Sequence, residues 1–243
     1  MILRTLVLLC SVLVVNVGWA QERTITVVGD KWCPFNCSDD PGDRGLLVER
    51  AAAALADANI GMRYLELPWS RAIAEVRAGE IDAIVGAGPE ETPDFHFPAR
   101  PLAIARHSFF TLPSSDWQYT GLESLAQVRL GVIQDYSYGT LFNDYIQPHK
   151  NDEQRIVVLR GNDVLPRLIE MLRLGRIDAF VAEERVLAYH FSSKSMPNPL
   201  RNAGLASEEN LYIAFSPALG DGVTLASLLS QQLPQLSITS QYD

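Results

Sequence analysis

One phrase occurs twice in this chain, and this repeat constrains the fold more than any other feature. Residues 71–85 read RAIAEVRAGEIDAIV and residues 167–181 read RLIEMLRLGRIDAFV, and the two match without a gap at Arg, Ile, Arg, Gly, Ile, Asp, Ala and Val. Each copy predicts a helix that ends at a glycine and is followed at once by a short apolar strand. Two similar α/β units favour two lobes with a cleft between them, a geometry suited to ligand capture.

Strands and helices are expected to alternate along the whole chain. The apolar spacing predicts strands at residues 24–29, 62–67, 81–85, 107–112, 129–133, 156–159, 177–181 and 211–216. It predicts helices at residues 45–58, 69–78, 138–146, 163–174, 183–191 and 222–233. This alternation predicts an α/β fold in which each lobe is a mainly parallel sheet flanked by helices. We expect residues 21–112 plus 207–243 in the first lobe and 113–206 in the second, joined by a two-strand hinge.

The N-terminus has the pattern of a cleaved export signal. Arg4 precedes an apolar run at residues 6–17, which is too short to span a bilayer comfortably. Small residues at Gly18 and Ala20 suit a signal peptidase, so we expect cleavage after Ala20 and a periplasmic location. An uncleaved anchor is the alternative. No later apolar run is long enough to span a membrane, so we expect no membrane insertion after cleavage.

The charge of the chain limits its partners. The formal net charge is −9, and loss of residues 1–20, which hold one basic and no acidic residue, makes it −10. An acidic surface argues against binding to nucleic acid, because phosphate recognition needs basic residues. It also argues against docking on an anionic membrane. The remaining length suits two lobes of about 100 residues each, and we expect a monomer.

The two cysteines outside the export signal, Cys33 and Cys37, lie close together in the sequence. Export places them in an oxidising compartment, which favours a local disulfide. A zinc site is disfavoured, because there is no second cysteine pair and the four histidines are scattered. We therefore expect neither a metal nor a cofactor.

Four loops are candidates for the ligand site. In open α/β sheets, ligands bind beyond the carboxyl ends of the strands, and this rule selects residues 30–35, 86–92, 134–139 and 182–184. The third loop runs into a helix N-terminus that favours an anion. There, Ser137 offers a hydroxyl, and Tyr136 and Tyr138 offer flat faces. The alternative is a capped turn with two half-buried tyrosines.

Aromatic and acidic residues near these loops have two interpretations each. Trp32, Phe35 and Trp69 would clamp a planar or apolar part of a ligand, or would pack in the core as most aromatic residues do. Glu183 would pair with a ligand amine, or would complement the dipole of a helix that begins there.

The paired acids of the repeat, Asp82 and Asp178, are expected to be structural. They lie at the strand ends away from the proposed cleft, where they would hold the helix–strand turns. The sequence contains no nucleophile elbow, phosphate loop or metal-binding helix, which favours a protein that is not an enzyme.

An ordered set of motifs resembles the bacterial extracellular solute-binding proteins of family 3. The motifs cover essentially the whole mature chain: WCPF at residues 32–35, GLLVE at 45–49, PWSR at 68–71, GEIDAI at 79–84, GVI at 131–133, YSYG at 136–139, GRIDAFV at 175–181 and YIAFS at 212–216. The resemblance implies a type II periplasmic-binding-protein fold. Its lobes would close on a small polar solute, typically an amino acid, and an ABC permease or a membrane sensor would read the closed form.

The resemblance also implies roles for particular residues. Phe35 and Trp69 would line the ligand, Ser137 and its neighbours would face it from the second lobe, and Glu183 would hold an α-amino group.

One expected feature of the family is missing. Residues 86–95 read GAGPEETPDF, with Gly88 and Glu91 in the loop but without the arginine that grips an α-carboxylate. Arg71 and Arg100 are the candidates to replace it. This absence leaves two interpretations open: a ligand that differs from a standard amino acid, or a protein that senses more than it transports.

Two other functions stay open. The first is a periplasmic enzyme on the same fold, similar to cyclohexadienyl dehydratase, which would need a general acid with a raised pKa in the cleft. Glu91 and Glu183 are the candidates for that acid. The second is a regulatory or interaction module whose cleft is filled by its own side chains.

Overall fold

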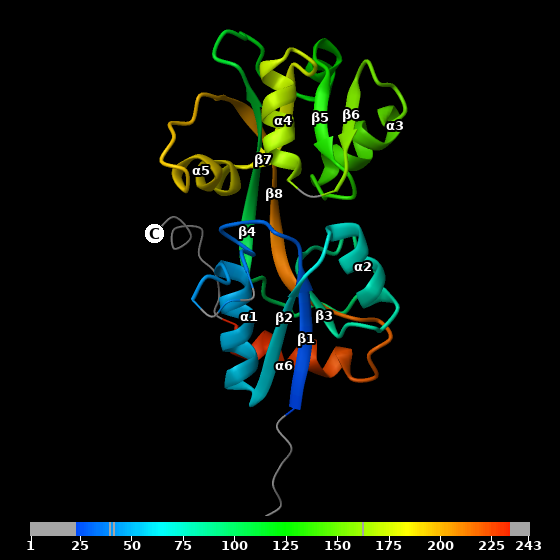
Figure 1. Ribbon diagram of the computed structural model, residues 1–243. Helices are drawn as coiled ribbons and strands as arrows, with labels where there is room; N and C mark the ends of the chain where they lie inside the picture. Colours follow the sequence, from blue (N-terminus) through cyan, green and yellow to red (C-terminus); the bar gives the residue numbers. More distant parts are fainter. Residues whose placement is uncertain (1–22, 39, 41, 162, 234–243) are drawn as a thin grey trace, which may run out of the picture.

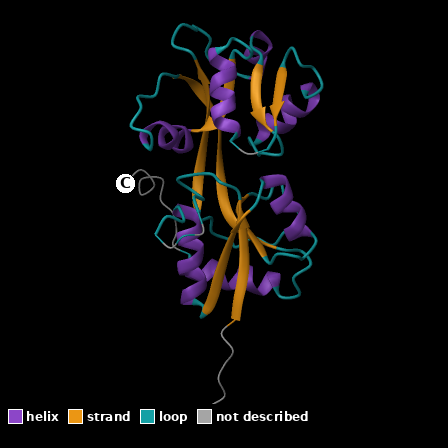
Figure 2. Cartoon of the chain, in the orientation of Figure 1, coloured by secondary structure: helices purple, strands orange, loops and turns teal. Residues whose placement is uncertain are grey.

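The computed structural model describes residues 23–38, 40, 42–161 and 163–233 of the 243-residue chain. They form two lobes joined by two long strands (Figures 1 and 2). The elements in chain order are β1 (Arg23–Gly29), α1 (Leu46–Asp57), β2 (Ile60–Glu66), α2 (Trp69–Arg77), β3 (Ala83–Ala87), β4 (Ala103–Thr111), the 3₁₀ turn η1 (Leu122–Gln127), β5 (Leu130–Ile133), the π-helical turn η2 (Phe142–Ile146), α3 (Gln147–His149), β6 (Ile156–Leu159), α4 (Val164–Arg173), β7 (Ala179–Glu183), α5 (Glu184–Ser192), β8 (Arg201–Phe215) and α6 (Gly222–Gln232). The expected export signal lies outside the described residues.

The strands form one continuous sheet in the order β2-β1-β3-β8-β4-β7-β5-β6. Each lobe contributes three parallel strands: β1 pairs with β2 and β3 in the first, and β5 pairs with β6 and β7 in the second. Between them, β4 and β8 pair antiparallel from Ala103 opposite Leu211 to Thr111 opposite Arg201. The predicted α/β architecture with two connecting strands is confirmed. The expected lobe boundaries, at residues 112 and 207, stay a prediction.

The sequence repeat forms the same unit in both lobes. α2 and β3 form the first copy, α4 and β7 the second, and each helix is followed by a glycine with positive φ, Gly79 at 79° and Gly175 at 64°. The Asp82 carboxylate accepts a hydrogen bond from the backbone N–H of Thr26 on β1 at 2.7 Å. Asp178 accepts from the backbone N–H of Arg129, just before β5, at 2.8 Å. The predicted structural role of both acids is confirmed.

The connecting strands are longer than the sequence pattern predicts. β4 begins at Ala103 instead of residue 107, and β8 begins at Arg201 instead of residue 211. Residues 201–210 of β8 are exposed or half-buried apart from Ala203, because much of this stretch crosses between the lobes. Such a segment carries little apolar periodicity, so the pattern underestimates it.

Two further local features affect the loops at the cleft. The predicted disulfide joins Cys33 to Cys37 in the loop after β1. The helix expected at residues 138–146 is irregular and contains the π-helical turn η2.

No helix in the described part of the chain combines the length and the apolar character needed to cross a bilayer.

Candidate functional site

A cleft lies between the lobes, and its cavities include an outer and an inner one; a third, of about 360 Å³, lies between α2 and the loop that carries Tyr136. The outer cavity, about 770 Å³, is lined from the first lobe by residues such as Leu67 and from the second by residues such as Pro166 and Tyr189. The inner cavity, about 40 Å³, lies against β3 and β8. Both cavities are bounded by the same five side chains: Asp30, Trp32, Trp69, His107 and Tyr136.

Tyr136 reaches from the second lobe into an aromatic slot of the first. Its ring lies 6.3 Å from that of Trp32 and 6.2 Å from that of Trp69, with interplanar angles of 82° and 72°. Edge-to-face pairs of this kind are favourable. The Tyr136 hydroxyl donates a hydrogen bond to the Asp30 carboxylate. The protein's own side chain thus fills part of the cleft.

The loop that carries Tyr136 makes further bonds across the cleft. The indole N–H of Trp69 donates across the cleft to the backbone carbonyl of Asp135 at 3.1 Å; its other bond, to the Glu91 carboxylate at 2.9 Å, stays within the first lobe. The hydroxyl of Ser70 donates to the Asp135 carboxylate at 2.5 Å. The bonds to Asp135 hold the two lobes together at the start of α2.

Three carboxyl groups face the inner cavity. Burial raises the pKa of Asp30 to about 6. Burial, with Glu209 and Asp30 nearby, raises the pKa of Glu91 to about 8. For Glu209 burial acts in the same upward direction, but bonding to His107 and to serine hydroxyls outweighs it and holds the pKa below its usual range. Among the described residues that line this cavity, none is Lys or Arg.

Most of the residues predicted for the site lie at the cleft. The inner cavity is lined by Trp32, Trp69, Gly88, Glu91, Tyr136 and Ser137. Tyr138 and Glu183 are at the outer cavity. The structure therefore brings loops of both lobes together, as the strand-end rule predicts.

Three of the predicted residues lie outside both cavities. Phe35 is 1% exposed and stacks beneath Trp32, with ring centroids 4.6 Å apart, so it belongs to the core. Arg71 is on the solvent face of α2 and pairs with Glu75 at 3.0 Å. Arg100 donates to the Leu233 carbonyl at 2.6 Å, after the end of α6. The structure does not place either arginine where a ligand carboxylate would bind in the cleft.

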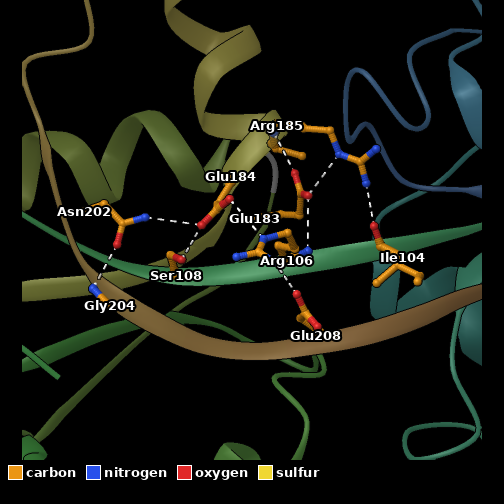
Figure 3. A network of polar contacts seen from close by, with 10 residues as sticks. Ile104, Arg106, Ser108, Glu183, Glu184, Arg185, Asn202, Gly204 and Glu208 are labelled. Carbon is orange, nitrogen blue, oxygen red and sulfur yellow. Dashed lines mark hydrogen bonds and ion pairs between the residues drawn. The ribbon is translucent and has the colours of Figure 1, made fainter. Parts of the chain in front are cut away.

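Of the two interpretations of Glu183, the contacts support the structural one, in which it caps a helix. Its carboxylate is fully buried and caps α5 by accepting the backbone N–H of Val186 at 2.8 Å. It also accepts from the backbone N–H of Arg106 at 3.3 Å and from the guanidinium of Arg185 at 3.4 Å (Figure 3). Both carboxylate oxygens are thus engaged, which leaves Glu183 poorly placed to receive an α-amino group.

The two polar residues beside Tyr136 are also bonded within the protein. Tyr138 is 1% exposed, and its hydroxyl accepts the backbone N–H of Ile133 at 2.9 Å. Ser137 donates to the Glu209 carboxylate. Ser137 therefore donates to a carboxylate of the protein itself, and a ligand anion would have to compete with Glu209 for this hydroxyl.

The inner-cavity residues that sequence reasoning missed include three titratable ones, Asp30, His107 and Glu209, and the buried amide of Asn36. Asp30 follows β1 directly and was inside a candidate loop. His107 and Glu209 lie on β4 and β8, 3.3 Å apart at the closest ring nitrogen and carboxylate oxygen. Recognising the full length of these strands would have placed both beside the cleft.

Comparison with known proteins identifies the fold. No family model matches the chain, and no curated protein matches its sequence. A histidine kinase sensor domain with similarity to periplasmic binding proteins has a TM-score of 0.70 at 20% identity, with 91% of this chain and 93% of that chain covered. An ancestral arginine-binding protein bound to arginine has a TM-score of 0.66 at 18% identity, with 86% and 90% covered.

A probable amino-acid ABC transporter extracellular-binding protein from Bacillus subtilis has a TM-score of 0.62 at 17% identity, with 87% of this chain and 90% of that chain covered. Likeness at these identities concerns the backbone. It shows that the chain has the type II periplasmic-binding-protein fold, as the motif resemblance implied.

Proposed function

We propose that this chain is an exported solute-binding protein that captures a small polar solute between its lobes. The observation that carries the proposal is the cleft of about 770 Å³, which is lined from both lobes and bridged by β4 and β8. In such an arrangement, a ligand that contacts both lobes shifts the population toward the closed form. An ABC permease or a membrane sensor in the periplasm would then read that form.

The contacts across the cleft suit reversible closure. The bonds of Trp69 and Ser70 to Asp135, and of Tyr136 to Asp30, join the start of α2 and the loop after β1 to the loop after β5. On the other side of the cleft, the Arg185 guanidinium of α5 lies 4.4 Å above the Phe35 ring. Opening the lobes would break these polar and cation–π contacts and withdraw Tyr136 from Trp32 and Trp69, but it would leave the strand pairing within each lobe intact, so its free-energy cost stays within reach of ligand binding.

The proposal is tested by binding measurements on the mature protein. A thermal-shift series with L-arginine, L-glutamine, small organic acids and alkylamines should give a saturable rise in Tm for one class. A ligand at 100 times its Kd adds about 2.7 kcal/mol of stability. Small-angle scattering with that compound should show a smaller radius of gyration. Absence of any saturable shift in all four classes would refute solute capture.

An enzymatic function is favoured by one observation, the position of the Glu91 carboxyl group in the inner cavity, where it accepts a hydrogen bond from Trp69. With a pKa raised by burial to about 8, Glu91 carries a proton at neutral pH and could act as a general acid in the cleft. Product formation from prephenate or arogenate by the wild type, and its loss in Glu91→Gln, would support the enzymatic function. Absence of turnover with the wild-type protein would refute the enzymatic function.

The insertion of Tyr136 between Trp32 and Trp69 bears on the third function, a module with a filled cleft. The side chain fills the aromatic slot, but the outer cavity of about 770 Å³ stays open beside it. Solute capture therefore remains the better-supported function.

A further inference from the structure

We propose, on the basis of the solute-binding function above, that the inner cavity receives a primary ammonium group and that the ligand is an alkylamine. Asp30, Glu91 and Glu209 all line this cavity, and His107 is the basic residue beside them. Asp30 and Glu91 each accept one side-chain hydrogen bond, from Tyr136 and from Trp69, and a carboxylate has further acceptor sites for the N–H donors of an ammonium ion. Glu209 is bonded to Ser137, Ser207 and His107, so it contributes negative charge beside the site.

Asn36 supplies independent support for a ligand at this position. Its side chain is fully buried and lines the same cavity, yet neither its amide nitrogen nor its carbonyl oxygen has a hydrogen-bond partner. The amide is close enough to lower the pKa of Asp30, but it lacks the geometry of a formed bond. A buried amide left in this state is rare, because its desolvation is not compensated. An ammonium ion could donate to its carbonyl oxygen.

The walls of the cavity also suit a cation. Trp32, Trp69 and Tyr136 all line it, and the negative face of an aromatic ring attracts ammonium ions. Trp32 further stacks on His107, with ring centroids 6.3 Å apart. Carboxylates and indole rings together recognise a positive charge, and none of the described residues that line the inner cavity carries a guanidinium or a lysine ammonium to bind a ligand carboxylate.

The size of the cavity sets how the ligand would lie. A volume of about 40 Å³ has room for a head group but not for a whole solute. The inner and outer cavities share Asp30, Trp32 and Trp69, so the alkyl chain would extend past these residues into the outer cavity. Tyr136 bounds both cavities and would move as the head group enters.

The protonation of the carboxyl groups gives the proposal a specific signature. Burial raises the pKa values of Asp30 to about 6 and of Glu91 to about 8, so the cavity without a cation holds protons near neutral pH. On the inner side Glu91 faces Trp69, Glu209, Asp30 and the hydroxyls of Tyr136 and Tyr138. It also borders an adjoining cavity of about 360 Å³, whose charged lining residues are Arg77, Glu90 and Asp135. A bound ammonium ion favours the ionised carboxylates, so binding should release protons.

The test is titration calorimetry at pH 7.5 with four probes of similar size: putrescine, butylamine, 1-butanol and butyrate. We expect the two amines to bind and the alcohol and the acid not to bind. Measurements in two buffers with different ionisation enthalpies should show proton release for the amines. Glu91→Gln should weaken amine binding by about tenfold or more, as expected for loss of a charge-assisted bond. Glu90→Gln is the matched control, because Glu90 is exposed and lies outside the inner cavity.

The outcomes separate this proposal from the function on which it rests. Butanol or butyrate binding as tightly as butylamine, or amine binding without proton release, would overturn the ammonium site. Tight binding of Ca²⁺ or Mg²⁺ that excludes butylamine would also overturn it, in favour of a metal. Saturable binding of an amino acid together with no binding of amines would refute the ammonium site and leave solute capture standing. Circular dichroism of both variants checks that they are folded.

Discussion

The ionisation of Glu91 in the cleft should change the free energy of unfolding of the whole protein, and the substitution Glu91→Gln measures this effect. The side chain accepts one hydrogen bond from the Trp69 indole at 2.9 Å, and two other carboxyl groups share its cavity. Gln has the same shape and can still accept that bond, but it cannot ionise. The variant therefore removes the charge with little change in packing.

The direction of the effect follows from the raised pKa. Burial raises the pKa of Glu91 from 4.5 to about 8 in the folded state. Between these two values the folded state binds a proton that the unfolded state has released, so the free energy of unfolding falls as pH rises. The full shift corresponds to about 5 kcal/mol, of which about 4 kcal/mol falls between pH 5 and pH 8.5. Opening of the lobes lets water reach the carboxylate, which makes these values upper limits.

Urea denaturation of the wild type and Glu91→Gln at pH 5 and pH 8.5 measures the effect. We expect similar stability at pH 5 and a variant that is more stable by about 2–4 kcal/mol at pH 8.5. The exposed neighbour supplies the control, since Glu90→Gln should follow the wild type at both pH values. A wild-type stability that falls by the same amount as that of Glu91→Gln over this range would refute the reasoning.

Three further substitutions test other parts of the structure. Trp69→Ala should weaken ligand binding by about tenfold or more and lower the free energy of unfolding by about 3 kcal/mol, since Trp69 is only 9% exposed. Unchanged affinity in a folded variant would show that Trp69 does not contact the ligand. Asp82→Ala should cost about 1–3 kcal/mol in urea denaturation, because it leaves the Thr26 N–H without its acceptor; a neutral effect would contradict the structural role. Tyr136→Phe should tighten butylamine binding severalfold in calorimetry, because the hydroxyl no longer competes for Asp30; weaker binding would show that the hydroxyl contacts the ligand instead.

The repeat made most of the fold predictable from the sequence. Its helix–glycine–strand pattern depends on local rules of apolar spacing and positive φ, and these operate in the same way in both lobes. Asp82 and Asp178 could be assigned structural roles from their position alone. The helix phase would also have excluded Arg71, since residues two apart on a helix point to different faces and Trp69 faces inward.

The candidate site was less predictable because it is built from residues far apart in the sequence. His107 and Glu209 meet only because β4 and β8 pair along their whole length, and the exposed half of β8 carries no apolar signal. Tyr136 contacts Asp30 across the cleft, a contact that no local pattern encodes. Phe35 resembled a ligand-lining residue, but the ring of Trp32 covers it. Tertiary packing decided each of these positions.

The antiparallel pairing of β4 with β8 also makes the second lobe a separable unit. Ala103 and Leu211 are directly opposite each other in the ladder, so the segment between them, which includes the β4 residues that pair with β7, leaves and re-enters at adjacent points, about 5 Å apart. Everything between them could be exchanged for the corresponding segment of another protein with this fold while two neighbouring junctions are preserved. A chimaera of this kind would combine the acidic pocket wall of one parent with the opposing loops of another, and recombination in nature would meet the same low geometric barrier.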